Sequence, residues 1–336
     1  MKAGVIRRAN GKIEIEERDR RKPGVGDVLI RVRACGVCHG DLMVQKGEFP
    51  FVTYPVVPGH EIAGVIEDIG EGVDWLRAGE RVGLSALYST CGHCEQCVAG
   101  NENLCPKWNF TGVMTNGGYQ EFLVAPALFV APLPNGLDFA EAAPFMCAGL
   151  TVYSALRHAG FESGQKVAVI GLGGLGSIGV QLVRAMGGRV SVISSTENKE
   201  AEARELGAEL FISAKSTSLA DVLRTWDGGA DIILLTAPSL QAASSAFPGL
   251  APDGTLVLLG MGPGEIAVNP WDLCMGRRRL MGSPAGSRRE LRETLQFAGA
   301  HKLHPSVKRY ALEAANDALD EMHQGSLCGR AVIVMN

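Results

Sequence analysis

The chain has 336 residues, of which 46% are hydrophobic and 20% are charged, and its formal net charge at pH 7 is −4. This length favours two domains with sizeable cores, and the slightly negative charge argues against nucleic acid as a partner. Because no apolar run reaches the roughly 18 residues of a membrane span and residues 1–8 lack the apolar core of a signal peptide, we expect a cytoplasmic protein with no membrane partner.

The first 84 residues are expected to form a small, irregular, glycine-rich β-domain. Alternating or apolar runs predict strands at 12–16, 28–32, 62–70 and 79–84. Prolines and glycines interrupt the segment from Cys38 to Pro58, which is therefore predicted to be a loop without a helix.

The stretch from Cys35 to Glu61 carries the types of side chain that bind metal. Cys38 and His60 suit a borderline-soft divalent ion such as zinc. Asp41 is placed to hold the imidazole of His60 through its second ring nitrogen, and Glu61 is placed to approach the ion from behind. A catalytic zinc usually has three protein ligands and one open position, so a further ligand is expected elsewhere.

The nine cysteines indicate metal binding more strongly than disulfides, because their number is odd and no secretory signal accompanies them. Four of them fall within fifteen residues: Cys91, Cys94, Cys97 and Cys105. Four thiolates close a tetrahedral zinc with no position left for water, which predicts a structural ion. The alternatives are buried free cysteines or two disulfides. His93 is interpreted as a solvated loop residue.

A helix is predicted from Leu137 to His158, with Asp138 and Glu141 as a capping box. Cys147 lies inside it, and the pattern alone favours a core cysteine over a metal ligand.

The sequence pattern changes at Lys166. An apolar strand at 166–170 leads through a glycine loop into an apolar helix at 177–186. In such a loop the first glycine permits the turn, the second lets the backbone approach a pyrophosphate and the third lets the helix pack on the strand. The anion binds to free N–H groups at the start of the helix. The loop comprises Gly171, Leu172, Gly173, Gly174, Leu175 and Gly176.

Strands and helices then alternate. Further strands are predicted at 189–194, 209–213, 231–236, 255–259 and 279–282, with helices at 199–206, 219–226 and 241–246. Six strands joined by crossover helices are typical of a doubly wound parallel sheet of the α/β class. The basic run at 277–279 is interpreted as a solvated face or a subunit contact. The remaining chain is predicted to contain a helix capped by Ser287 and Glu290, a helix at 314–324 and a strand at 331–334.

Together these landmarks resemble the zinc-dependent medium-chain dehydrogenase/reductase family, and most closely its bacterial tetrameric branch and the cinnamyl-alcohol-type aldehyde reductases. The resemblance covers nearly the whole chain. It is carried by Gly36-Val37-Cys38-His39, Gly59-His60-Glu61, the Cys91–Cys105 lobe, Cys147-Ala148-Gly149-Leu150-Thr151, the glycine loop and Gly329-Arg330. It implies a catalytic GroES-like domain at 1–148, on which 285–336 folds back, and a Rossmann domain at 149–284.

The resemblance also implies two zinc ions per chain. The catalytic ion is expected on Cys38, His60 and Cys147, with Glu61 as an exchangeable ligand. The nicotinamide is expected near Thr151, and His39 and Arg330 match positions that contact the cofactor pyrophosphate; a surface salt bridge is the alternative for Arg330. The family forms homodimers or homotetramers that act on small molecules.

The second Rossmann strand ends with hydroxyls where NAD enzymes place an acid. Ser194, Ser195 and Thr196 can donate to a 2′-phosphate, and Lys199 adds positive charge, although Glu197 opposes it. This pattern favours NADPH over NADH. The alternative is that the hydroxyls only cap the next helix.

One departure from the family affects the chemistry. Gly40 and Met43 stand at the positions of the family's usual proton relay, and neither side chain can transfer a proton. The first interpretation is reduction of an aldehyde or ketone, with the proton moving through water or the cofactor ribose, assisted by His39. The alternatives are reduction of activated C=C or C=N bonds, and a cofactor-binding member without catalysis. Candidate substrate-contacting residues are Phe49, Tyr54, Trp108, Phe110 and Met261.

Overall fold

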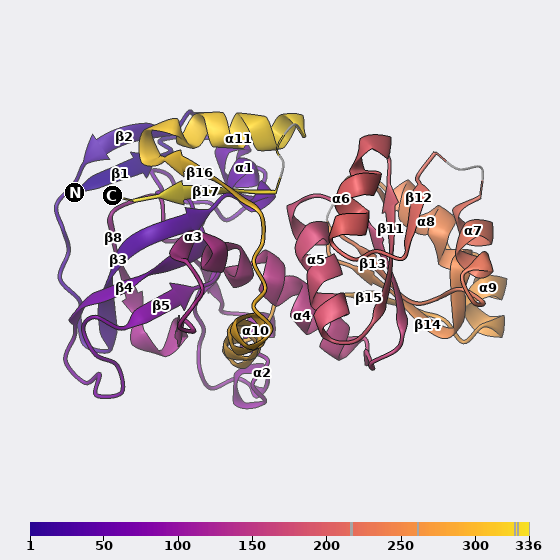
Figure 1. Cartoon of the computed structure of the whole chain (residues 1–336). Helices are drawn as coiled ribbons and strands as arrows, with labels where there is room; N and C mark the ends of the chain where they lie inside the picture. Colours follow the sequence, from indigo (N-terminus) through magenta and orange to yellow (C-terminus); the bar gives the residue numbers. More distant parts are fainter. Residues whose placement is uncertain (216–217, 261, 326, 328, 336) are drawn as a thin grey trace. The chain divides into compact units, whose positions relative to one another are not determined.

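The computed structural model describes residues 1–215, 218–260, 262–325, 327 and 329–335. The chain divides into two compact units (Figure 1). The first unit comprises Met1–Leu150 and Gly286–Asn336, and the second comprises Thr151–Ala285. The candidate metal ligands and the glycine loop therefore belong to different units.

A seven-stranded sheet forms the centre of the first unit, in the order β16-β17-β3-β4-β5-β9, with β8 also paired to β3. Its strands are β3 (Asp27–Gly36), β4 (Glu61–Ile69), β5 (Arg81–Leu84), β8 (Phe122–Pro126), β9 (Val130–Pro132), β16 (Val307–Ala311) and β17 (Arg330–Val334). β17 pairs antiparallel with the end of β3, so the C-terminal segment completes the sheet that the N-terminal segment begins. Two small two-stranded sheets pair β1 (Lys2–Val5) with β2 (Glu14–Glu17) and β6 (Leu87–Ser89) with β7 (Asn109–Phe110).

The segment predicted as a loop without a helix contains α1 (His39–Lys46), so that prediction is wrong. Asp41 stabilises the start of this helix, because its carboxylate accepts a hydrogen bond from Cys38 N at 2.9 Å. The helix ends at Gly47, which adopts the left-handed conformation that commonly ends helices.

The predicted helix from Leu137 to His158 is broken into α3 (Phe139–Ala142), the 3₁₀ turn η3 (Ala143–Met146) and α4 (Ala148–His158). Pro144 lacks a backbone N–H, which explains the interruption. Asp138 caps the first piece through Ala140 N, but Glu141 pairs with His304 instead of closing a capping box. The break matters because Cys147 lies directly at it.

The remaining helical elements of the first unit are short, apart from two near its C-terminus. They are α2 (Glu95–Val98), η1 (Glu102–Leu104), η2 (Ala127–Phe129), α10 (Arg288–Ala300), η6 (Leu312–Ala314) and α11 (Ala315–Gln324). The predicted capping box of Ser287 and Glu290 is confirmed at the start of α10. α11 packs beside α1 (Figure 1). β16 was not predicted.

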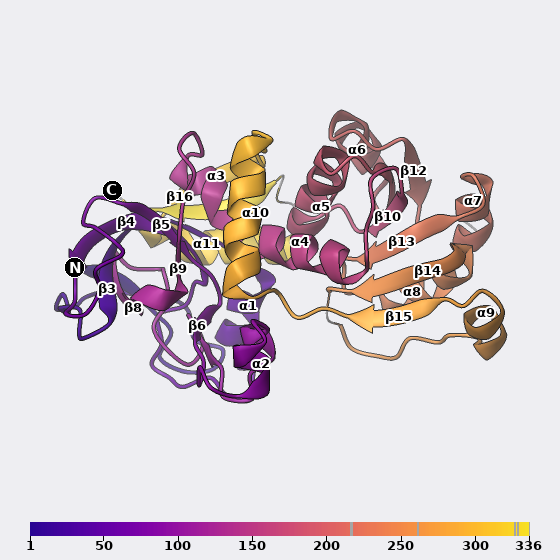
Figure 2. The ribbon, with the colours of Figure 1, turned by 90° about the horizontal axis from the view of Figure 1, so that it is seen from below.

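The second unit contains a six-stranded parallel sheet in the order β12-β11-β10-β13-β14-β15, which confirms the α/β class and the doubly wound topology. Its strands are β10 (Lys166–Ile170), β11 (Arg189–Ser194), β12 (Leu210–Ser213), β13 (Ala230–Leu235), β14 (Leu250–Leu258) and β15 (Arg279–Gly282). Figure 2 shows β13, β14 and β15 side by side. The buried strands carry near-continuous apolar runs because helices cover both faces.

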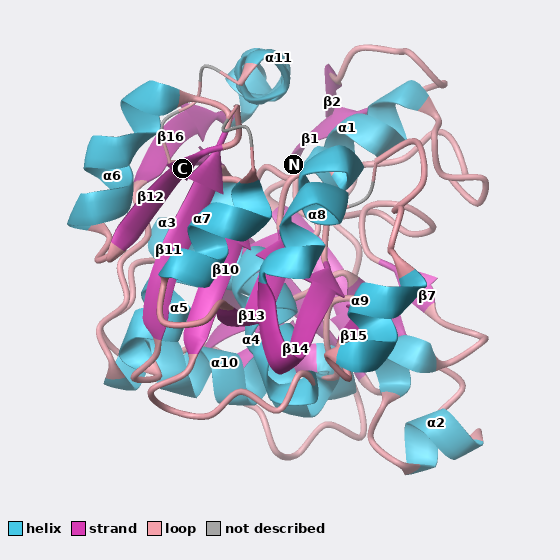
Figure 3. Cartoon of the chain, turned by 90° about the vertical axis from the view of Figure 1, so that its right-hand side faces the viewer, coloured by secondary structure: helices cyan, strands magenta, loops and turns pink. Residues whose placement is uncertain are grey.

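The helices of this unit are α5 (Gly174–Ala185), α6 (Glu200–Glu205), α7 (Leu219–Thr225), α8 (Leu240–Ala246) and α9 (Pro270–Met275), with 3₁₀ turns η4 (Glu197–Lys199) and η5 (Phe247–Gly249). α5 and α6 lie on one face of the sheet, and α7 and α8 lie on the other (Figures 1 and 3). α9 was not predicted; Asn269 caps it and Pro270 occupies its first turn. Among the described residues, no single helix is long and apolar enough to cross a membrane; only the bent pair Phe139–Met146 and Ala148–His158 passes by length and composition.

Candidate metal and cofactor sites

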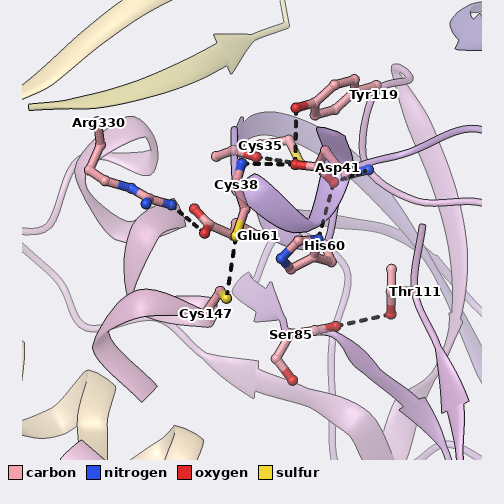
Figure 4. A network of polar contacts seen from close by, with 12 residues as sticks. Cys35, Cys38, Asp41, His60, Glu61, Ser85, Thr111, Tyr119, Cys147 and Arg330 are labelled. Atoms are coloured by element: carbon pink, nitrogen blue, oxygen red, sulfur yellow. Dashed lines mark hydrogen bonds and ion pairs between the residues drawn. The ribbon is translucent and has the colours of Figure 1, made fainter. Parts of the chain in front are cut away.

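The first unit brings four candidate ligands together. The ligand atoms of Cys38, His60, Glu61 and Cys147 all lie within 4.8 Å of one another (Figure 4). Cys38 follows β3, and His60 precedes β4; the antiparallel pairing of Gly36 with Glu61 places the two strand ends together. Cys147 comes from the break between η3 and α4, and its Sγ lies 3.9 Å from that of Cys38.

Asp41 orients the imidazole of His60. The carboxylate is fully buried, and its Oδ1 lies 3.1 Å from His60 Nδ1. A carboxylate acceptor at this distance assigns the proton to Nδ1 and leaves Nε2 as the ligand atom. The structure therefore places Asp41 where the sequence predicted it. It also adds Tyr119, whose hydroxyl donates to Asp41 at 3.2 Å and which no sequence motif marked.

Glu61 and Arg330 form a buried ion pair beside the sulfurs (Figure 4). Burial raises the pKa of Glu61 to about 7, and the charge of Arg330 opposes that shift. Burial alone would lower the pKa of Arg330, but the carboxylate of Glu61 reverses this, and the net shift is upward. Arg330 is only 7% exposed, so it is not the surface salt bridge considered above; its contact with a pyrophosphate stays a prediction.

The pKa shifts and the unpartnered oxygen at this site are those expected where a cation binds. The hydrogen bond between the two sulfurs lowers the pKa of Cys38 and raises the pKa of Cys147. Burial disfavours protonated His60, but the negative charges of Asp41 and Cys38 outweigh it and raise its pKa. Glu61 Oε2 is buried without a hydrogen-bond partner. Two sulfurs, an imidazole and an orphaned carboxylate oxygen fit a divalent zinc ion.

The second cysteine cluster is also convergent. The Sγ atoms of Cys91, Cys94, Cys97 and Cys105 lie within 4.8 Å of one another. The separations of 3.6 Å from Cys105 to Cys91 and 3.9 Å from Cys91 to Cys97 exceed a disulfide bond of about 2 Å. Backbone N–H groups lower the pKa of Cys91 to about 6, which favours the thiolate. His93 is exposed and lies outside the cluster.

The glycine loop of the second unit has the geometry that phosphate binding needs. Gly171 has a left-handed φ of 97°, and a Cβ on Gly176 would lie 1.9 Å from Gly171 O, so neither position accepts a side chain. A Cβ on Gly173 would meet nothing within 4 Å, so space remains above it. α5 begins at Gly174, and its first-turn N–H groups follow the loop. Thr236, which sequence reasoning missed, donates to the carbonyl oxygens of Ile170 and Gly171 at 2.9 Å.

The hydroxyls at the end of β11 have mixed surroundings. Ser194 is buried, and its Oγ accepts a hydrogen bond from Thr196 N at 3.2 Å, as in a local turn. Ser195 and Thr196 are exposed. Lys199 pairs with Glu202 at 2.7 Å. Thr151 lies in α4 and is buried, whereas His39, the first residue of α1, is exposed.

Three of the predicted substrate-contacting residues share one aromatic cluster. The rings of Trp108 and Phe110 are stacked, with their centroids 4.1 Å apart. The ring centroid of Phe51, which was not predicted, lies 4.9 Å from that of Trp108 and 5.4 Å from that of Phe49. Tyr54 instead donates its hydroxyl to Val44 O. Met261 lies outside the described residues.

Comparisons with known proteins match both units. Residues 24–135 match the family model "Alcohol dehydrogenase GroES-like domain", and residues 174–300 match "Zinc-binding dehydrogenase". An alcohol dehydrogenase from Geobacillus stearothermophilus is 40% identical, with 99% of each chain covered. Among solved structures, a cinnamyl alcohol dehydrogenase from Sorghum bicolor is 32% identical with a TM-score of 0.90, covering 99% of this chain and 97% of that one. CAD from Helicobacter pylori complexed with NADP(H) is 28% identical with a TM-score of 0.88 and the same coverage.

Proposed function

Because the chain belongs to the zinc-dependent medium-chain dehydrogenase/reductase family, we propose that it is a zinc-dependent enzyme that transfers hydride between NADP(H) and an aldehyde, ketone or alcohol. Its relatives support oxidoreductase activity of the alcohol dehydrogenase type. The observation that carries the proposal is the convergence of Cys38, His60, Glu61 and Cys147 within 4.8 Å. An open three-ligand site with an exchangeable carboxylate suits catalysis more than structure.

We assign the catalytic zinc to Cys38, His60 and Cys147, and a structural zinc to the four-cysteine lobe. When bound, the catalytic ion supplies Lewis acidity to a substrate oxygen. Asp41 holds the ring of His60 so that Nε2 faces the other ligand atoms. Arg330 binds one oxygen of Glu61 and leaves the other free toward the sulfurs, which supports an exchangeable role for that carboxylate.

The dinucleotide is assigned to the second unit. The glycine loop and the start of α5 would hold the pyrophosphate, because their N–H groups and open space suit an anion. The hydroxyls of Ser194, Ser195 and Thr196 support NADPH over NADH, as does the NADP(H) complex of a similar protein. The ion pair of Lys199 with Glu202 weakens the contribution assigned to that lysine.

A second candidate function is reduction of activated C=C or C=N bonds. Gly40 favours it, because the residue packs against His60, where a Cβ would lie 3.1 Å from the ring, and offers no hydroxyl for a relay. A test assays the purified protein with NADPH and NADH against saturated aldehydes, enals and cyclic iminium compounds. Carbonyl reduction supports the first proposal; turnover only of C=C or C=N bonds supports the second.

Metal analysis together with a turnover assay distinguishes these enzymatic functions from a cofactor-binding member without catalysis. We expect two zinc ions per chain and measurable NADPH turnover. Two ions without turnover of any tested substrate would favour the non-catalytic alternative. We also expect a homodimer or homotetramer, which sedimentation analysis measures directly.

A further inference from the structure

Asp41 has an unusually complete set of hydrogen bonds for a carboxylate with no solvent exposure. Its Oδ1 accepts a hydrogen bond from Gly59 N at 3.1 Å and lies 3.1 Å from His60 Nδ1. Its Oδ2 accepts hydrogen bonds from Cys38 N at 2.9 Å and from the hydroxyl of Tyr119 at 3.2 Å. One carboxylate therefore joins the two segments that carry Cys38 and His60, and Tyr119 is the only one of its four partners from a third segment (Figure 4).

The position of Tyr119 is fixed by its surroundings. Its side chain is fully buried. Its backbone N–H donates to Pro58 O at 3.0 Å, and Gly118 N donates to Gly59 O at 2.8 Å, so its segment runs beside the one that carries His60. The ring also lies on Gly59: a Cβ there would come within 2.4 Å of it. Burial, these backbone hydrogen bonds and the contact with Gly59 thus hold the hydroxyl of Tyr119 at Asp41.

We propose that Tyr119 is a positioning residue for the catalytic metal, acting through Asp41 on His60; the inference rests on the proposed metal site. Without the hydroxyl, Oδ2 keeps a single donor, Cys38 N. The carboxylate then gains rotational freedom, and Oδ1 loses its fixed place beside the imidazole. His60 Nε2 points less uniformly at the other ligands, so the ion binds more weakly.

The test uses Tyr119→Phe, which keeps the ring and removes only the hydroxyl. The matched control is Tyr88→Phe, since Tyr88 donates to a backbone carbonyl, Val124 O, also at 3.2 Å and in the same unit. Metal-free protein is titrated with Co²⁺ against a chelator, and the absorption bands distinguish the two-sulfur site from the four-sulfur lobe. The lobe serves as an internal reference in every variant.

We expect Tyr119→Phe to weaken Co²⁺ binding at the Cys38, His60 and Cys147 site by about tenfold, within the range for loss of an outer partner of a ligand. Binding at the four-cysteine lobe should not change, and Tyr88→Phe should change neither site. Unchanged affinity in Tyr119→Phe, or an equal loss at both sites, would overturn the inference. A variant that does not fold would also overturn it, because loss of one hydroxyl should leave the packing intact.

A double-mutant cycle separates positioning from general packing. Asp41→Asn alone should weaken the same site at least as much as Tyr119→Phe. If Tyr119 acts through Asp41, adding Tyr119→Phe to Asp41→Asn should have no further effect; a full additive loss contradicts the inference. If the parent protein binds Co²⁺ only at the four-cysteine lobe, the proposed function fails instead, and the titration shows this before any variant is made.

Discussion

Replacing Arg330 by methionine should destabilise the first unit, because it leaves Glu61 buried without its partner. Glu61 is 0% exposed and Arg330 is 7% exposed, so neither charge is screened by water. Breaking a buried pair by removing one member costs about 3–5 kcal/mol. Burial already raises the pKa of Glu61 to about 7, so the orphaned carboxyl will take up a proton, and we expect the lower end of that range, about 3 kcal/mol.

The assay is a thermal melt of the metal-free protein in chelator, so that metal binding does not add to stability. A loss of about 3 kcal/mol corresponds to a fall in Tm of roughly 6–12 °C for a unit of this size. The matched control is Arg309→Met, since Arg309 pairs with Asp138 at 2.8 Å but the two side chains are 52% and 46% exposed. That change should cost less than about 1 kcal/mol.

The double variant Glu61→Gln with Arg330→Met completes the test. Removing both charges should recover most of the lost stability, because no uncompensated charge remains. Equal melting temperatures for Arg330→Met and Arg309→Met, or no recovery in the double variant, would refute the reasoning.

Four further substitutions test the metal and the cofactor sites. Cys147→Ala should lower the metal content from two ions to one per chain by mass spectrometry and abolish turnover; retention of both ions would exclude Cys147 as a ligand. Ser194→Asp should shift the ratio of kcat/KM for NADPH and NADH toward NADH by at least about tenfold, since a carboxylate repels a 2′-phosphate and accepts from a 2′-OH; an unchanged ratio counts against the assignment. Gly173→Ala should weaken cofactor binding in a fluorescence titration with little change in Tm, because its Cβ meets nothing within 4 Å. Gly176→Ala should instead lower Tm, because its Cβ would collide with Gly171 O at 1.9 Å; the opposite ranking would contradict the loop geometry.

The sequence predicted the second unit well, since local patterns determine it. Strands 166–170, 189–194 and 279–282 have the predicted bounds, and the first two are buried, largely apolar runs. The candidate metal ligands were also recognisable, but from family motifs and not from periodicity. Pattern alone favoured a core role for Cys147, and only the sheet pairing and the break at Pro144 bring it to Cys38.

The misses have two physical causes. α1 was missed although its cap is local: Asp41 accepts a hydrogen bond from Cys38 N three residues earlier, but a cysteine is not among the residues that usually mark a helix start. The pairing of Arg330 with Glu61 spans 269 residues, and the contact of Tyr119 with Asp41 spans 78. No local pattern carries such contacts, so they emerge only when the sheet is assembled.

The dispersal of the candidate site residues along the chain also has a consequence for biosynthesis under the proposed metal assignment. The four cysteines of the lobe lie within the fifteen residues from Cys91 to Cys105, so a nascent chain would present all four before Cys147 is made. The other ligand set is incomplete until Cys147 has been synthesised, and Glu61 gains its ion-pair partner only when Arg330 follows. On the proposed assignment, the structural ion would therefore bind before the catalytic one.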